Sequence, residues 1–327
     1  MHLEGSLEPE LTFELAARHD VPLRYGSVEE LRRAYEFENL QDFLDLYYEG
    51  ARVLRTERDF HDLTAAYFRR AAQANIRHAE IFFDPQTHTT RGIALPAVVE
   101  GISAAMREAE RTHGISSGLI PCFLRDASPA AAMATLEGLL GFGDRIVAVG
   151  LDSAERGNPP GAFATVFARA RAAGLRAVAH AGEEGPPAYI RQALELLQVS
   201  RIDHGVRCEE DPALVTELAA TRIPLTVCPL SNVKLRVFPS LEHHNLRRLL
   251  TRGLCVTINS DDPAYFGGYV NENFLGARRA LGLTGDEIYQ LARNSFEASF
   301  LDEARKQSLI AELETAVAAH HQSNTSA

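Results

Sequence analysis

Short runs of branched and aromatic residues recur along this 327-residue chain, and each run is followed by a segment with helical character. Most of the runs are apolar on both faces, as strands of a buried parallel sheet are. Because strand and helix alternate without an all-strand block, the pattern predicts an α/β fold with a parallel sheet. The runs are residues 76–83, 118–123, 146–151, 175–180, 201–204, 223–227 and 255–259.

Helical signals occupy the segments between these runs. Phe60, Leu63 and Tyr67 keep the three- and four-residue spacing of a helix face that packs against a core. Asp211 directly precedes Pro212, which predicts the start of another helix. A carboxylate at that position can cap free backbone N–H groups, and proline suits the first helical turn.

The number of runs indicates a closed barrel. Seven strands are visible, and an eighth can begin at or before the first residue. We therefore predict a single (β/α)8 barrel, or TIM barrel, whose first strand is truncated at the N-terminus. No linker rich in Gly, Ser or Pro divides the chain, so we expect one domain over residues 1–319. The polar residues 320–327 predict a disordered tail.

Charge and hydropathy narrow the class of protein. Lys and Arg total 33 against 44 Asp and Glu, a formal net charge of -11, with no basic stripe. This balance argues against a nucleic-acid partner. No apolar run approaches the roughly 18 residues of a membrane span, and no leader opens the chain, so we predict a cytoplasmic protein with no membrane partner. The sequence does not indicate an oligomeric state.

The four cysteines do not form a motif. They are widely spaced, and none belongs to a C-x-x-C pair, so a zinc cluster or a disulfide framework is not expected. We expect all four to behave as small buried hydrophobic residues. They are Cys122, Cys208, Cys228 and Cys255.

Ionisable residues stand at the ends of strands that are otherwise apolar. A lone strand-end histidine is more often structural, and an aspartate in a turn often bonds its own backbone. However, the carboxyl ends of all the strands of a parallel barrel meet at one rim. Imidazole and carboxylate together suit Zn²⁺, and a catalytic zinc keeps one position open for water. The set therefore predicts a metal site formed from His2, His180, His204, Asp261 and Asp262.

Glu183, three residues after His180, is the candidate general acid or base. A carboxyl group beside a metal and shielded from water can have its pKa raised towards neutrality, as proton donation requires. The neighbouring Glu184 is expected to be a solvated loop carboxylate.

Other polar residues near strand ends are weaker candidates. His88 follows the strand over 76–83 and would lie at the mouth of the barrel. Ser231 and Asn232 follow the strand over 223–227 and are expected to brace that loop. The pair at 243–244 is expected on the surface of a helix.

Four motifs, in this order along the chain, resemble the adenosine/adenine deaminase family of the amidohydrolase barrels. They are HLEG at 2–5, HAGE at 180–183, HG at 204–205 and SDDP at 260–263. Further segments resemble the bacterial and fungal adenine deaminase branch, namely 82–89, 150–155 and 262–269. The resemblance covers nearly the whole chain. It implies a zinc-dependent hydrolytic deamination of adenine to hypoxanthine and ammonia, in purine salvage, with a purine base as the small-molecule partner.

The resemblance also implies a role for each site residue. One Zn²⁺ per active site would be held by His2, His180 and Asp261. Glu183 would donate a proton to N1 of the purine. His204 would orient the attacking water and help to deprotonate it, and Asp262 would hydrogen-bond N7 of the ring. Bound zinc lowers the pKa of water from 15.7 to about 7, which suits this chemistry.

Two acidic residues bear on the choice between base and nucleoside. Nucleoside deaminases of the family resemble Gly at the position of Glu155 and Asp at that of Glu4. Glu155 would bind substrate by accepting a hydrogen bond from N9–H, which only the free base has, and Glu4 would fill space that a ribose needs. The resemblance thus favours adenine, with adenosine or N6-substituted adenines as alternatives.

The N-terminus departs from the family pattern. The family motif begins His-x-His-Leu-Glu-Gly, and here Met1 stands at x, so this sequence lacks one metal ligand and most of its first strand. We expect a longer native product with a histidine just before Met1. The alternative of another class is an inactive barrel that only binds purines.

Overall fold

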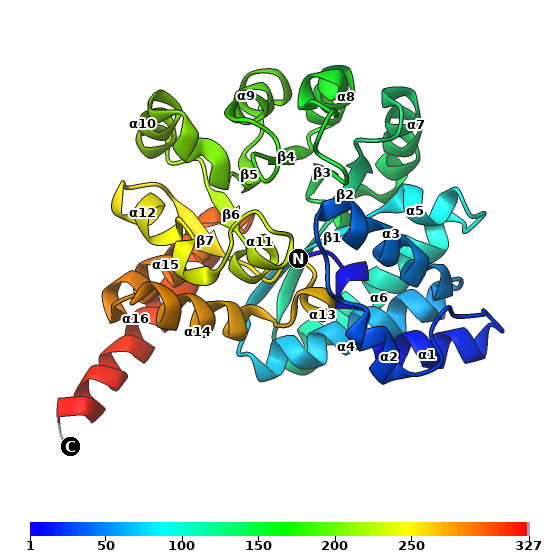
Figure 1. The fold of residues 1–327 in the computed structure, drawn as a ribbon, viewed down its shortest axis with the longest axis horizontal. Coiled ribbons are helices and arrows are strands. Elements are labelled where there is room, and N and C mark those ends of the chain that lie inside the picture. The colour runs from blue at the N-terminus through cyan, green and yellow to red at the C-terminus, as the bar shows by residue number, and fades with distance from the viewer. Residues whose placement is uncertain (326–327) are drawn as a thin grey trace.

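The computed structural model describes residues 1–325 and shows parallel strands enclosed by helices (Figure 1). The strands lie side by side in chain order, and every neighbouring pair is parallel. Every strand expected from the sequence is present close to its expected bounds. The strands are β1 (His78–Phe83), β2 (Ser116–Leu124), β3 (Ala148–Asp152), β4 (Arg176–Ala181), β5 (Arg201–His204), β6 (Leu225–Val227) and β7 (Val256–Ile258).

Helices cover the outer face of the curved sheet (Figure 1). The predicted helix around Leu63 is α4, and the predicted cap of α10 is confirmed, because Asp211 accepts hydrogen bonds from the backbone of Ala213 and Leu214. The helices are α1 (Pro9–Arg18), α2 (Val28–Arg33), α3 (Leu40–Gly50), α4 (Glu57–Gln73), α5 (Pro85–Thr89), α6 (Leu95–His113), α7 (Pro129–Leu139), α8 (Ala164–Ala172), α9 (Pro187–Gln192), α10 (Pro212–Thr221), α11 (Pro229–Lys234), α12 (Leu246–Thr251), α13 (Pro263–Phe266), α14 (Val270–Leu281), α15 (Gly285–Ala298) and α16 (Glu303–Thr325).

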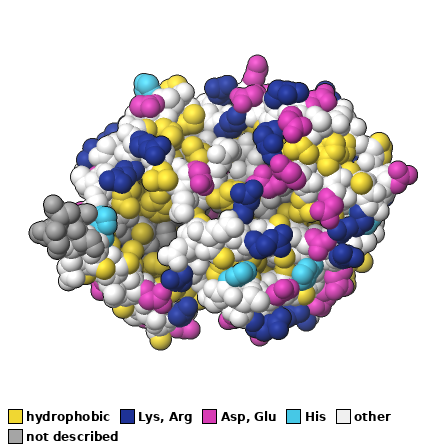
Figure 2. Space-filling model, turned by 90° about the horizontal axis from the view of Figure 1, so that it is seen from below, with side chains coloured by type: hydrophobic (Ala, Val, Ile, Leu, Met, Phe, Trp, Pro, Cys, Tyr) yellow, Lys and Arg dark blue, Asp and Glu magenta, His cyan; other side chains and the backbone are white. Residues whose placement is uncertain are grey.

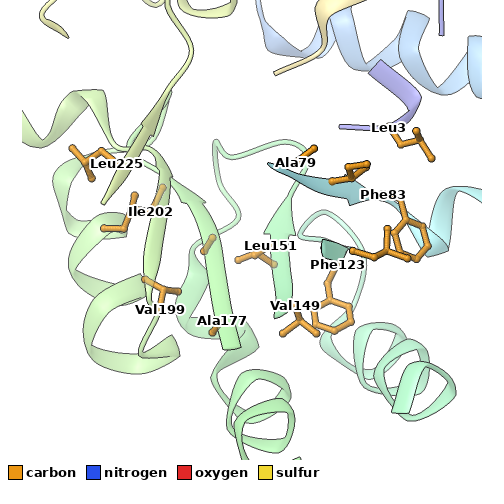
Figure 3. Packing of buried hydrophobic residues seen from close by; sticks show 14 of the residues in the cluster. Leu3, Ala79, Phe83, Phe123, Val149, Leu151, Ala177, Val199, Ile202 and Leu225 are labelled. Carbon is orange, nitrogen blue, oxygen red and sulfur yellow. The ribbon is translucent and has the colours of Figure 1, made fainter. Parts of the chain in front are cut away.

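The main hydrophobic core lies between the strands and the helices. Side chains such as Phe83, Phe123 and Leu151 project from neighbouring strands into this layer (Figure 3). Phe123 of β2 meets Phe167 of α8 edge-on, with ring centroids 5.9 Å apart. Burial of each such side chain contributes about 1.5–3 kcal/mol. This packing fixes the strands so that their carboxyl ends share one rim.

Residues Met1–Leu3 take the place of a first strand at that rim. The His2 amide donates to the Asp261 carbonyl at 3.0 Å, and the Leu3 amide donates to the Phe82 carbonyl at 2.8 Å. These bonds join the segment after β7 to β1, which supports a (β/α)8-type barrel with a truncated first strand. Towards the opposite end, no strand among residues 1–325 pairs with both β1 and β7. A cavity of about 390 Å³ lies there, lined by residues 76–80 and 258–260 among others.

The end of the chain differs from its prediction. Helix α16 continues to Thr325, whereas a disordered tail was predicted from residue 320. The alanines at 316, 318 and 319 are strong helix formers and extend the helix into the polar residues. The rest of the predicted tail, residues 326–327, lies outside the described residues.

Charges of both signs share the surface, and the cysteines are buried as expected. Basic and acidic side chains are interspersed over the face shown in Figure 2, with no continuous basic stripe. No helix within residues 1–325 is long and apolar enough to cross a membrane. All four cysteines are buried and free of disulfides.

Candidate active site

Three of the predicted residues meet at the rim in a geometry that suits a metal ion. His2 Nε2 lies 3.2 Å from His180 Nε2 and 3.7 Å from Asp261 Oδ1. A tetrahedral zinc with ligands at about 2.0–2.1 Å places ligand atoms about 3.4 Å apart. The three residues come from the N-terminal segment, from β4 and from the turn after β7. The donor set therefore fits Zn²⁺, and the predicted ligands are brought together.

The protonation of the two histidines also favours a metal. Burial lowers the pKa of both His2 and His180 well below the ordinary value, so both rings are neutral near pH 7. Neutral imidazole is the form that binds a metal ion. Asp261 also adopts a positive φ of 56°. Such strain in a residue with a side chain is typical of functional sites.

Glu183 lies beside this donor set, where burial favours the protonated form of its carboxyl group. Its side chain is buried, with Oε1 3.6 Å from His204 Nε2 and without a hydrogen-bond partner. Burial raises the pKa of Glu183 to about 8. The carboxyl group is therefore largely protonated at neutral pH and can serve as an acid.

Asp262 is a second buried carboxyl group that faces the same pocket. Its Oδ1 has no partner, and burial raises its pKa well above the ordinary value. Buried polar atoms without partners are rare in native proteins, and each one calls for an explanation such as a bound ligand. The unpartnered oxygens of Glu183 and Asp262 are thus available to a molecule in the pocket.

A chain of hydrogen bonds fixes the tautomer of His204. The Leu246 amide donates to Nδ1 of His244 at 3.0 Å, so the proton of neutral His244 is on Nε2. That nitrogen donates to Asn232 Oδ1 at 3.1 Å, which leaves Asn232 Nδ2 to donate to His204 Nδ1 at 3.2 Å. Neutral His204 therefore carries its proton on Nε2, towards Glu183. This tautomer suits the orienting part of its predicted role, since it donates to an oxygen at the site.

The sequence did not identify Asn232 and His244, the two hydrogen-bonded residues behind His204, as site residues. His244 is buried, whereas the sequence places it on a helix surface. Burial lowers its pKa to about 3, so it stays neutral. Asn232 was expected only to brace its loop. Nothing in the local sequence shows that the two side chains meet.

Apolar side chains close the pocket over the polar rim. They come from α3 and from two further segments, and they give the pocket an apolar cover. Tyr47 also donates to Asp84 at 3.2 Å. The apolar and aromatic lining consists of Leu40, Phe43, Leu44, Tyr47, Tyr48, Leu235 and Phe266.

Three further residues belong to the site and were missed. Asp84 and Asp152 line the pocket, and burial raises the pKa of Asp152 to about 7. Cys228 lies close enough to form a possible metal-binding group with His204 and Asp261. All three stand at the end of a strand or directly after one, so the strand-end rule that found the other site residues would have found them too.

The structure corrects the predicted role of Glu155. Its side chain is 1% exposed and does not line the pocket. Both oxygens accept hydrogen bonds from the backbone of residues 182–185. The turn after β3 directs the side chain behind that loop, so the carboxylate faces backbone amides and not the pocket. Glu4 is also turned away, because it accepts hydrogen bonds from His88 and from the Asp84 amide. His88 is fully buried and does not lie at the mouth.

Three buried histidines and several buried carboxyl groups at the C-terminal rim of a parallel barrel define a metal-dependent hydrolase of the amidohydrolase type.

The family model described as adenosine deaminase matches residues 1–316, and the chain belongs to this deaminase family. It is 61% identical over 310 residues to the adenine deaminase of Ralstonia nicotianae, covering 94% of this chain and 90% of that protein. A crystal structure of an adenine deaminase from Arthrobacter aurescens superposes with a TM-score of 0.96 at 51% identity, covering 97% of each chain. A zinc-bound amidohydrolase from Burkholderia ambifaria superposes with a TM-score of 0.92 at 27% identity, covering 100% of this chain and 91% of that one.

Proposed function

We propose that this deaminase converts adenine and water to hypoxanthine and ammonia, a reaction of purine salvage. The observation that carries the proposal is the buried carboxyl group of Glu183, whose Oε1 has no hydrogen-bond partner, beside a metal-binding donor set. The high identity to proteins named adenine deaminase supports adenine as the substrate. The match to a zinc-bound relative supports zinc as the metal.

The proposed zinc would be held by His2, His180 and Asp261, one ion per site. When bound, it supplies a Lewis acid that lowers the pKa of water from 15.7 to about 7. His204 donates from Nε2 to the oxygen that attacks C6 of the purine. The ring and its relay partners are buried, which holds this donor in one orientation.

The two protonated carboxyl groups act on the purine ring. Glu183 transfers its proton to N1, so that the ring can accept an electron pair there while the oxygen bonds to C6. As the oxygen bonds to C6, one proton of the water replaces the proton that Glu183 gave to N1. The second proton then moves to the amino group, so that the C6–N bond breaks as C6=O forms and ammonia leaves. Asp262, whose pKa burial raises, donates a hydrogen bond to the lone pair of N7. Both donors favour an uncharged purine with acceptors at N1 and N7.

The test is ammonia release from adenine, adenosine and N6-methyladenine, before and after chelation and with zinc restored. We expect the highest kcat/KM on adenine, one zinc per chain, loss of activity on chelation and recovery with Zn²⁺. A higher kcat/KM on adenosine than on adenine would overturn the proposal that the substrate is the free purine base. Full activity in metal-free protein would overturn the zinc proposal. Absence of ammonia from every purine would favour the purine-binding barrel.

A further inference from the structure

We propose that Glu155 is the positioning residue for the proton donor, because its carboxylate anchors the backbone of the loop that carries Glu183. The inference rests on the proposed role of Glu183 as the acid. It assigns Glu155 no contact with the purine or with the metal.

Four successive backbone amides converge on this one carboxylate. Glu155 Oε1 accepts from the amide of Gly182 at 2.7 Å. Oε2 accepts from the amides of Glu183, Glu184 and Gly185 at 3.1, 2.7 and 2.7 Å. Consecutive amides that point to one centre form an anion-binding nest, and hydrogen bonds to an ionised acceptor are about twice as strong as neutral ones. The anion in this nest belongs to the chain itself.

Two glycines allow the loop to wrap around the carboxylate. Gly182 has a φ of 73°, and a Cβ there would lie 2.4 Å from Ile190 Cδ1. A Cβ on Gly185 would lie 2.5 Å from Glu155 Oε1. Side chains at either position would push the loop off its anchor. The anchor thus explains why a glycine stands on either side of the pair Glu183 and Glu184.

The other side of the anchor is equally constrained. The Asn158 amide donates to the Glu155 carbonyl at 3.1 Å, which closes the turn. Arg125 is buried and donates to the carbonyls of Asn158 and His180 at 2.8 and 2.7 Å. The turn that carries Glu155 is therefore tied to the strand that carries a predicted metal ligand. Glu155 links the proton-donor loop to the same frame.

The test variant is Glu155→Gln, which keeps the shape but places an NH₂ group against backbone N–H donors. We expect kcat on adenine to fall about 10–100-fold, as for other residues that orient a catalytic group. KM should stay within a few-fold, and zinc content should not change. Glu184→Gln is the matched control, since it removes the adjacent carboxylate of the same loop. Glu184 is not solvated as expected, because its side chain is 8% exposed, but it forms an ion pair only with exposed Arg156 at 3.4 Å among the described residues, so its loss should have a much smaller effect.

A double-mutant cycle distinguishes positioning from a general structural role. If Glu155 acts through Glu183, the variant Glu155→Gln/Glu183→Gln will be about as slow as Glu183→Gln alone. Losses that multiply would overturn the proposal. Glu155→Asp keeps the charge with a shorter reach and serves if the Gln variant does not fold. Its kcat should fall between wild type and the Gln variant, and unchanged kcat would count against the anchor.

Hydrogen exchange of the loop amides separates this proposal from the proposed function. Exchange is measured without substrate, so it reports on the anchor even if the protein does not deaminate adenine. We expect the amides of residues 182–185 to exchange faster in Glu155→Gln than in wild type. The amides of β4, which precedes this loop, should exchange at an unchanged rate. Unchanged exchange in that loop would overturn the anchor whatever the activity.

Discussion

The two ends of the barrel interior bury glutamates in opposite electrostatic surroundings. At the base, Glu80 of β1 lies 2.5 Å from Arg201 of β5, whose guanidinium stacks over Phe300 at 4.6 Å. Burial would raise the pKa of Glu80, but Arg201 and His78 lower it to about 2. At the rim, the Glu183 side chain is 5% exposed, against 8% for Glu80, and its pKa rises to about 8.

The difference shows that the partner, rather than burial alone, decides whether a buried carboxyl group is charged. The rim carboxyl groups of Glu183, Asp261 and Asp152 form ion pairs only with histidines among the described residues. A permanent cation there would ionise the acid and occupy the metal site. The base has that cation against its carboxylate, whereas buried Arg125 at the rim bonds backbone carbonyls and leaves these carboxyl groups their proton and room for a metal.

The largest expected effect is on catalysis at the rim. Glu183→Gln removes the proton and keeps the shape, so kcat should fall about 10²–10⁴-fold. Steady-state ammonia release measures it, and Glu184→Gln is the control. Equal losses in the two variants would mean that the acid is another residue.

The same substitution at the base, Glu80→Gln, should affect the free energy of unfolding instead of catalysis. Glu80→Gln removes the nearer charge partner of buried Arg201 and leaves only Asp203 at 3.9 Å, which costs about 3 kcal/mol of unfolding free energy at pH 7. The folded pKa of about 2 lies below the ordinary 4.5, so this stabilisation is complete above pH 4.5 and is lost as the pH falls towards 2. Denaturant titrations of both proteins at pH 7 and pH 3.5 should show the gap narrowing. A gap that is constant or grows in acid would contradict the ion-pair explanation.

Glu183→Gln should change stability in the opposite direction in chelated protein. The folded pKa of about 8 exceeds the ordinary 4.5, so below pH 4.5 the group is protonated in both states and does not change the free energy of unfolding. As the pH rises from 4.5 to 8, it ionises more readily in the unfolded chain and destabilises the fold. Removing it should raise the unfolding free energy at pH 7 by about 3 kcal/mol. Calorimetry or denaturant titration checks the sign. Destabilisation by this variant would mean that the two ends do not differ as described.

The smallest effect should come from the relay behind His204. Asn232→Asp offers acceptors to both neighbouring histidines and so favours a His204 proton on Nδ1 instead of Nε2. We expect kcat to fall about tenfold, with zinc content unchanged. Nitrogen NMR of the histidine rings would show the tautomer directly. A wild-type His204 with its proton on Nδ1 would refute the relay.

The sequence supported the strands and the rim residues well. Apolar runs separated by helical segments specify a parallel barrel, and in such a barrel every strand ends at the same rim. His180, His204 and Asp261 could therefore be grouped from their strand-end positions alone. The sequence did not predict the direction of a side chain that projects from a turn. Glu155 was expected against the purine, yet it turns behind the loop of residues 182–185.

By itself, the sequence determined which residue types stand at the ends of the strands and hence which chemistry is possible. Only the tertiary structure decided how they are oriented and protonated. The pKa of Glu183 depends on burial by residues distant in the chain, and the His204 tautomer depends on an amide at Leu246. Strand periodicity is a local property of the backbone. Hydrogen-bond direction and desolvation arise only when segments far apart in sequence are packed together.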